Sequence, residues 1–277
     1  KFQRTNQKGM SYSEIKKTQN KFMILKNNLN ENLCLRNKDF RAAKIGVIIA
    51  GRLKSSRLKR KALLPIREKL SIQWCYETCM TINSADEYIL ATSNLPEDAE
   101  LEDTIKFSKK MKIYKGDPDD VISRYLGACS EYEIDVVIRV TADCPFISEE
   151  IAEILLKEHF ENGADYTAAR DFAVGTSCEI INTSALKSVI KYFGKAELSE
   201  YMTWYFQNNS KVYKVNIIDL PSNLIRDYRL TLDYKEDLEM FKNLLQKLRK
   251  KPPTTRNIFK ILDENPKINA INSHLSL

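Results

Sequence analysis

A basic loop is the first part of the chain whose residue types and spacing could do chemistry. Directly after the apolar run at 45–50, six cationic side chains occur within ten residues: Arg52, Lys54, Arg57, Lys59, Arg60 and Lys61. Such a run is typical of a solvated face, an RNA-binding patch or a loop that holds phosphate. Neither GxxxxGK(S/T) nor GxGxxG occurs here. A phosphate would therefore be held by backbone N–H groups at 53–56 and by the side chains of Arg57 and Lys61.

Two isolated carboxylates follow other apolar segments. Asp143 comes after the predicted strand 135–140, and Asp233 comes after the predicted strand 228–232. In open α/β sheets, ligands bind beyond the carboxyl ends of the strands, where the basic loop also begins. Mg²⁺ is typically held by one or two carboxylates together with phosphate oxygens and waters. These residues therefore predict a phosphate-rich ligand with a divalent cation between them.

Purely structural roles compete with this interpretation. The basic loop could be a solvated surface, and Asp143 could cap the turn before Pro145. Asp233 could be the N-cap of a helix at 234–249. These alternatives stay open when the residues are considered alone.

Composition limits the class of protein. The 277 residues are 43% hydrophobic and 29% charged, and no apolar run approaches the roughly 20 residues of a membrane span. The net charge of +7 arises in residues 1–44, where eleven basic residues face three acidic ones; the other 33 basic and 34 acidic residues nearly cancel. We therefore expect no nucleic-acid partner. Six cysteines without a CxxC pair, and only two histidines, argue against a zinc site or a histidine-based triad and favour a cytoplasmic protein.

The apolar pattern predicts an α/β fold with a mostly parallel mixed sheet and covering helices, because strands alternate with helical segments. In the first half, the predicted strands are 44–50, 87–92, 111–114 and 135–140, and the predicted helices are 71–82, 97–110 and 118–132. In the second half, we predict strands at 164–169, 178–181, 211–218 and 228–232, and helices at 148–161, 183–192, 197–208, 234–249 and 254–263. One domain is expected at 44–277. Residues 1–43 are a basic polar leader that could be the tail of a preceding domain.

Several ordered motifs resemble one enzyme family. AGRLKSSRLKRKALLPI (50–66) resembles the signature ARxxSTRLPGKxLLPI, and ATSNLPED (91–98) resembles ATSTNPED. KGDPDDVISRY (115–125), VIRVTADCPFI (137–147) and YRLTLDYKEDLEM (228–240) are similar to RGSEDDVLDRY, VIRITADCPLI and LRLTVDTPEDLEL. Over residues 44 to about 265 the chain thus resembles the cytidylyltransferases of the spore-coat polysaccharide type. These are relatives of the CMP-sialic acid and CMP-Kdo synthetases.

The resemblance implies a Rossmann-like nucleotide-diphospho-sugar transferase fold, similar to glycosyltransferase A. It implies Mg²⁺-dependent transfer of a cytidylyl group from CTP to a sugar or sugar acid, which releases pyrophosphate and gives a CMP-activated sugar for surface polysaccharide or glycan synthesis. Asp143 and Asp233 become the Mg²⁺ ligands, and Arg57 and Lys61 bind the triphosphate. A homodimer is possible.

The resemblance also implies which other residues line the site. The expected nucleotide-binding residues are Ala50, Gly51, Arg52, Ser55, Ser56, Ala91, Thr92, Arg124, Thr141 and Ala142. Of these, Ala91, Thr92 and Arg124 approach the cytosine, although Arg124 could instead be an ordinary exposed helix residue. Glu179 and Glu200 are expected near the acceptor.

Departures from the family pattern leave alternatives. Lys54, Lys59 and Arg60 stand where the family has glycine and Pro-Gly, and Ser177 and Tyr201 replace an Asp and a His near the acceptor. A catalytically inactive nucleotide-binding or interaction module is therefore one alternative. A glycosyltransferase of the A type is another, because Asp117 and Asp119 form a DxD sequence after the predicted strand 111–114.

Overall fold

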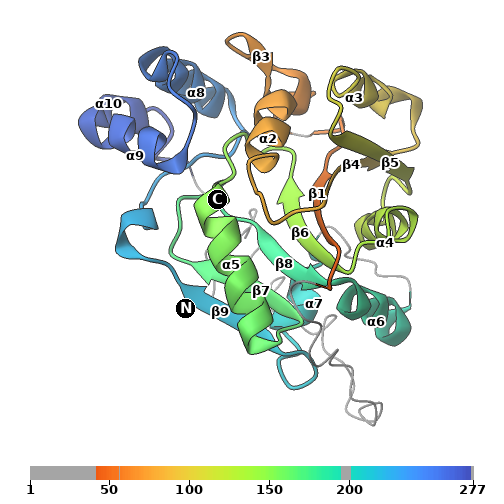
Figure 1. Ribbon diagram of the computed structural model, residues 1–277. Helices are drawn as coiled ribbons and strands as arrows, with labels where there is room; N and C mark the ends of the chain where they lie inside the picture. Colours follow the sequence, from red (N-terminus) through yellow and green to blue (C-terminus); the bar gives the residue numbers. More distant parts are fainter. Residues whose placement is uncertain (1–41, 56, 195–200, 276–277) are drawn as a thin grey trace, which may run out of the picture.

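A computed structural model describes residues 42–55, 57–194 and 201–275. Its centre is a seven-stranded sheet with the strand order β5-β4-β1-β6-β8-β7-β9 (Figure 1). The strands are β1 (Ile45–Ala50), β4 (Glu87–Ser93), β5 (Met111–Gly116), β6 (Val136–Thr141), β7 (Tyr166–Arg170), β8 (Glu179–Asn182) and β9 (Val215–Asp219). Strands β5, β4, β1 and β6 are parallel, whereas β8 runs antiparallel to both of its neighbours. The predicted mixed, mostly parallel sheet is confirmed.

The register of the central strands brings three strand ends together. Ala50, the last residue of β1, is paired with Ala91 on β4 and with Thr141 on β6. The ladder continues beyond the strands, because the N–H of Gly51 donates to Ala91 O (3.1 Å) and the N–H of Ala142 donates to Ala50 O (3.0 Å). The loops that follow β1, β4 and β6 therefore leave the sheet side by side.

Helices cover both faces because side chains alternate along each strand. On one face, α2 (Ser71–Cys79) and α5 (Glu149–Asn162) pack on the cluster that contains Ile49. On the other face, α4 (Val121–Glu131), α6 (Thr183–Phe193) and α7 (Trp204–Gln207) pack on the cluster that contains Ile48. No helix in the described part of the chain is long and apolar enough to cross a membrane.

The last helices form a separate layer. Helices α8 (Lys235–Leu248), α9 (Thr255–Glu264) and α10 (Pro266–Asn269) enclose a third apolar cluster and lie together at one end of the molecule, in blue in Figure 1. The remaining short elements are η2 (Lys61–Leu63), β2 (Pro65–Ile66), β3 (Lys69–Leu70), η3 (Pro96–Asp98), α3 (Glu100–Asp103) and η5 (Ser222–Leu224). Strands β2 and β3 form a small antiparallel hairpin.

Two predicted elements are wrong. The segment 97–110 is not one helix but η3 followed by the four-residue α3, since the hydroxyls of Thr104 and Ser108 bond nearby main-chain groups and compete with helix continuation. The segment 228–232 is not a sheet strand. Among the described residues it belongs to neither sheet and makes an isolated bridge between Arg229 and Val174. The predicted helix 197–208 lies partly outside the described residues, and α7 accounts for its end.

Candidate active site

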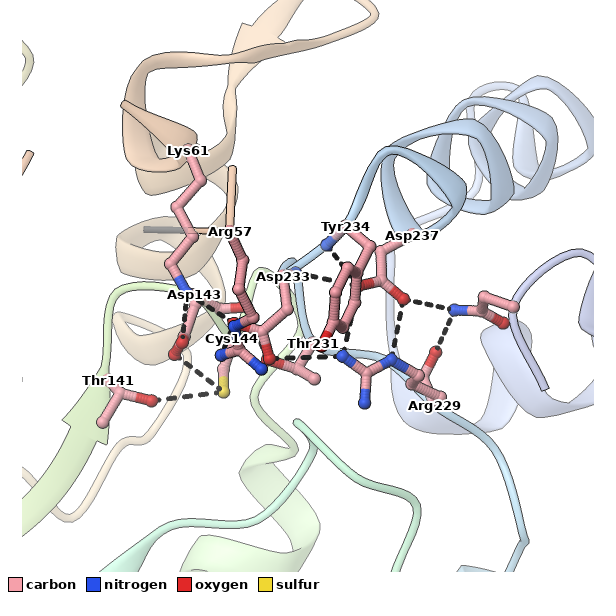
Figure 2. Close-up of polar contacts among 11 residues, drawn as sticks. Arg57, Lys61, Thr141, Asp143, Cys144, Arg229, Thr231, Asp233, Tyr234 and Asp237 are labelled. Atoms are coloured by element: carbon pink, nitrogen blue, oxygen red, sulfur yellow. Dashed lines mark hydrogen bonds and ion pairs between the residues drawn. The ribbon is translucent and has the colours of Figure 1, made fainter. Parts of the chain in front are cut away.

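One ammonium group joins the two carboxylates that the sequence singled out. Lys61, the first residue of η2, donates from Nζ to Asp143 Oδ2 at 2.6 Å and to Asp233 Oδ1 at 2.8 Å (Figure 2). Burial alone would lower the pKa of Lys61, but Asp143 and Asp233 outweigh it and raise the pKa above its ordinary value. Lys61 is therefore a firmly charged cation between two anions.

Arg57 adds a second cation to the same centre. Its guanidinium is paired with Asp233 Oδ1 and lies 5.2 Å from the centroid of the Tyr234 ring. The basic loop thus separates into two kinds of residue. Arg57 and Lys61 turn inward, whereas Lys59 is exposed and Arg60 is paired with the exposed Glu100.

Hydrogen bonds between distant segments bring the carboxylates together. The N–H of Leu232 donates to Asp143 O at 2.8 Å, and the Thr231 hydroxyl donates to the same oxygen at 3.2 Å. The extended segment before α8 is therefore docked on the loop after β6. The structure thus brings Asp143 and Asp233, which the sequence analysis placed at one site, together on Lys61. Asp233 is not the N-cap of α8, because that position belongs to Tyr234.

A buried layer behind Asp233 fixes its orientation. Arg229 donates from Nη2 to Asp233 Oδ2 at 3.2 Å and from Nε to Asp237 Oδ1 at 2.8 Å. Asp237, which is fully buried, also accepts from the N–H groups of Asp233 (2.8 Å) and Tyr234 (2.9 Å) and from Asn272 Nδ2 (2.9 Å). Arg229 therefore engages Oδ2 of Asp233, while Oδ1 faces Lys61 and Arg57.

The sequence analysis missed this layer, although a signal was present. Arg229 and Asp237 both fall in the quoted stretch YRLTLDYKEDLEM. An acidic residue in the first helical turn is also common, since it can accept from the free N–H groups of a helix start. What the sequence did not show is that Asp237 reaches back to Asp233 rather than only to its own helix.

A second missed residue holds the basic loop. Asp98, only 1% exposed, accepts from the N–H of Leu53 at 2.6 Å and from the Ser93 hydroxyl at the end of β4. The loop also passes close to β6, because a Cβ at Gly51 would lie 2.9 Å from that of Ala142. Ala50, Gly51, Thr141 and Ala142 therefore sit where β1 and β6 end. Ser55 is partly buried in the loop, and Ser56 lies outside the described residues.

The cytosine-facing residues of the prediction have unpaired polar atoms. Arg124 is on α4 and is 3% exposed, and its Nε and Nη1 have no hydrogen-bond partner within the described part of the chain. Thr92 is fully buried on β4 next to Ala91, and its Oγ1 also has no hydrogen-bond partner among these residues. A Cβ at Gly116 would lie 2.9 Å from Arg124 Cγ, and Gly116 is paired with Ser93 at the end of β4. Arg124 is therefore not an ordinary exposed helix residue.

Burial has an electrostatic consequence at Arg124. Desolvation, and then the nearby Arg52, lower the pKa of its guanidinium. A buried guanidinium without hydrogen bonds costs free energy unless a ligand supplies acceptors. The donors of Arg124 and the hydroxyl of Thr92 therefore fit a polar ligand at the end of β4.

The DxD sequence has other partners. Asp117 Oδ1 accepts from the N–H groups of Asp119 and Asp120, each at 2.8 Å, and so shapes its own loop. Asp119 is paired with Arg52 at 3.2 Å, and Arg52 also donates to Pro118 O. Arg52, expected at the nucleotide, thus holds the loop between β5 and α4.

Glu179 belongs to a polar chain on β8. One of its carboxylate oxygens is paired with Arg139, and the other accepts from the Tyr166 hydroxyl at 2.6 Å. Gln207 in turn donates to that hydroxyl at 2.9 Å. Glu179 in this arrangement orients Arg139 and Tyr166 rather than presenting a free carboxylate to an acceptor. Glu200 lies outside the described residues.

The donor set at Lys61 fits a hard divalent cation. Two carboxylates from separate segments converge on one ammonium, which marks a position where a positive charge is stabilised. Among residues 42–55, 57–194 and 201–275, no group of three or more His, Cys, Asp or Glu side chains could hold a metal by itself. Two carboxylates suit Mg²⁺, which keeps several waters and takes further oxygens from substrate phosphates.

Curated proteins share this sequence pattern. A family model described as cytidylyltransferase matches residues 46–261. The spore coat polysaccharide biosynthesis protein SpsF of Bacillus subtilis is 27% identical over 229 residues, which cover 79% of this chain and 94% of the relative. An uncharacterized protein of Methanocaldococcus jannaschii is 29% identical over 233 residues, covering 84% of this chain and 96% of that protein.

Solved structures share the fold. A cytidylyltransferase from Leptospira borgpetersenii has a TM-score of 0.76 at 24% identity, covering 85% of this chain and 99% of its own. CMP:2-keto-3-deoxy-manno-octonic acid synthetase in complex with CTP has a TM-score of 0.58 at 17% identity, covering 74% and 99%. The expected nucleotide-sugar transferase fold is confirmed. Because the family model covers most of the chain, this protein is a nucleotidyltransferase that belongs to the cytidylyltransferase family.

Proposed function

We propose that this enzyme transfers a cytidylyl group from CTP to a hydroxyl of a sugar or sugar acid, with Mg²⁺, and releases pyrophosphate. The observation that carries the proposal is the convergence of Arg57, Lys61, Asp143 and Asp233 at the carboxyl end of the sheet. The name of the Bacillus subtilis relative refers to polysaccharide synthesis, which supports a CMP-activated sugar as the product.

In this proposal the carboxylates bind the metal and the cationic side chains bind the phosphates. Asp143 and Asp233 would hold the Mg²⁺, which when bound neutralises charge that develops on the α-phosphate. Arg57 and Lys61 would pair with the phosphates that leave as pyrophosphate, since cations placed where charge develops stabilise the transition state. Arg229 and Asp237 would keep Asp233 in position.

Arg124 and Thr92 would select the base. A guanidinium offers several N–H donors in one plane. Cytosine presents two adjacent acceptors, O2 and N3, whereas uracil carries a proton on N3. The donors of Arg124 that have no partner among the described residues therefore favour cytosine over uracil.

A covalent enzyme intermediate on the nearby thiol is not supported. Cys144 follows Asp143 directly, but burial, and then the charge of Asp143, raise its pKa well above the ordinary value. The thiol is therefore protonated and a poor nucleophile. Direct attack of the acceptor hydroxyl on the α-phosphate requires no such group.

The test incubates the enzyme with Mg²⁺, with either CTP or UTP, and with one acceptor at a time from a panel of neutral sugars and 2-keto-3-deoxy sugar acids. The measurements are the pyrophosphate released and the mass of the product. We expect CTP-dependent release together with a CMP-linked product. Asp143→Asn should abolish it, whereas Asp119→Asn should retain most of it. Loss with Asp119→Asn and retention with Asp143→Asn would instead favour the glycosyltransferase alternative. Nucleotide binding without turnover on any acceptor would favour the inactive module.

A further inference from the structure

The position that the proposed function gives to a divalent cation is occupied by a side chain of the protein. Lys61 Nζ lies within 2.8 Å of both Asp143 and Asp233 (Figure 2). Arg57 contacts Asp233 of this pair and stacks near Tyr234, so Lys61 is the cation that bridges the two carboxylates.

Within the part of the chain that the structure describes, the surrounding ion-pair cluster is balanced in charge. It contains three carboxylates, Asp143, Asp233 and Asp237, and three cations, Arg57, Lys61 and Arg229. The side chains of Lys61, Asp143 and Asp233 are only 16%, 22% and 10% exposed, so water screens them incompletely. A divalent cation added to this arrangement would meet the Lys61 ammonium at close range and would leave the cluster with excess positive charge.

A nucleoside triphosphate changes that balance. It carries about four negative charges, so its complex with a divalent cation brings net negative charge to the cluster. The ammonium of Lys61 is a compact charge on a flexible four-carbon stem and can move from carboxylate to phosphate oxygens. In this exchange the Lys61 ammonium keeps an anionic partner, whereas entry of the metal alone places two cations between the same two carboxylates.

We propose that the Lys61 ammonium occupies the position between Asp143 and Asp233 that a divalent cation would take. Binding of the divalent cation therefore depends on the nucleotide, which draws Lys61 away from the carboxylates. The inference rests on the proposed function for the identity of the metal site. It adds that Lys61 has two sets of partners in turn. These are the carboxylates when no nucleotide is bound and the phosphates when the nucleotide is bound. Free metal is thereby kept out until the substrate arrives.

The experiment measures Mn²⁺ binding to the full chain without nucleotide, by the electron paramagnetic resonance signal of free Mn²⁺. The variants are Lys61→Met and Lys61→Gln, and the control is Lys59→Met, an exposed lysine in the same loop. We expect both Lys61 variants to bind Mn²⁺ at least about tenfold more tightly than the wild type. Lys59→Met should bind as the wild type does.

Thermal unfolding gives a second readout. Lys61→Met leaves two carboxylates facing each other, so its melting temperature in EDTA should fall and Mn²⁺ should restore it. Adding Asp143→Asn to Lys61→Met should remove this Mn²⁺ response. Equal Mn²⁺ affinity in wild type and both Lys61 variants would overturn the proposal. Since no CTP is present, a failed cytidylyl transfer assay would contradict the proposed reaction without changing this result.

Discussion

The two ends of the candidate site differ in how their charges are satisfied. At the Asp143–Asp233 end, Arg57 and Lys61 already have carboxylate partners within the protein. At the end of β4, Arg124 Nε and Nη1 have none among the described residues, and neither has Thr92 Oγ1. At the first end, Arg57 and Lys61 must exchange their carboxylate partners for ligand oxygens. At the second end, the donors are already in place and have no hydrogen-bond acceptor among the described residues. Selection of the base and control of the metal are therefore expected at different ends.

The largest effect should come from the inward-facing cations. Arg57→Met and Lys61→Met each remove a charge proposed to stabilise the departing pyrophosphate, a loss of roughly 2–4 kcal/mol in transition-state binding, or about 30- to 1,000-fold in rate. The measurement is kcat/KM for CTP at saturating Mg²⁺. Rates within about threefold of the wild type in both variants would remove these residues from the chemistry.

Arg124→Met should separate binding from stability. We expect CTP binding to weaken about tenfold or more and the preference over UTP to disappear, because the variant loses the donors for cytosine. The free energy of unfolding without ligand should stay the same or rise, since the variant removes a buried guanidinium whose Nε and Nη1 have no partner among the described residues.

Arg139→Met is the matched control for this prediction. It removes a partly buried arginine that does have a partner, Glu179, so it should lower the free energy of unfolding by roughly 3 kcal/mol. Denaturant titration of the two variants compares them directly. A similar loss of stability in both would mean that Arg124 has a structural partner in solution.

Arg229→Lys should have a smaller effect on the metal end. A lysine keeps the charge but not the planar fork that contacts Asp233 and Asp237 together. We expect the Mg²⁺ concentration for half-maximal rate to rise about tenfold while KM for CTP at saturating Mg²⁺ changes little. If Arg229 only supported the fold, the Mg²⁺ requirement would be unchanged and only the melting temperature would fall.

The outward-facing cations should give the smallest effect. Lys59→Ala and Arg60→Ala remove exposed charges, of which Arg60 is paired with an exposed glutamate. Such charges contribute under about 1 kcal/mol and are screened by salt. Less than about fivefold change in kcat/KM, decreasing further at high salt, is expected. Losses equal to those of Arg57→Met would show a diffuse basic surface instead of a phosphate site.

The sequence was sufficient where signals are local or periodic. Apolar strands alternating with helices predicted the central sheet. Polar residues directly after predicted strands were expected to place Lys61, Asp143 and Asp233 at one site. It failed at 97–110 and 228–232, where apolar pattern alone does not show whether a segment continues a helix or joins a sheet. The second case matters most, because the segment pairs with the loop at Asp143 rather than with a strand.

The supporting contacts could not be read from the sequence because they join distant residues. Asp98 holds Leu53 across 45 positions, and Asn272 reaches Asp237 across 35. Whether a charged residue such as Arg124 is buried without a partner also depends on packing that no local pattern encodes. These features emerge only when the helices are placed on the sheet.

Calorimetric titration of the full chain with CTP and with UTP, in Mg²⁺ and without acceptor, tests the central claim most directly. The two ends described above should form one site, so CTP should bind once per chain and at least about tenfold more tightly than UTP. Asp143→Asn should weaken CTP binding in Mg²⁺ while retaining the preference for CTP, which belongs to the other end. Equal affinities for CTP and UTP in the wild type, or no binding of either, would contradict the account.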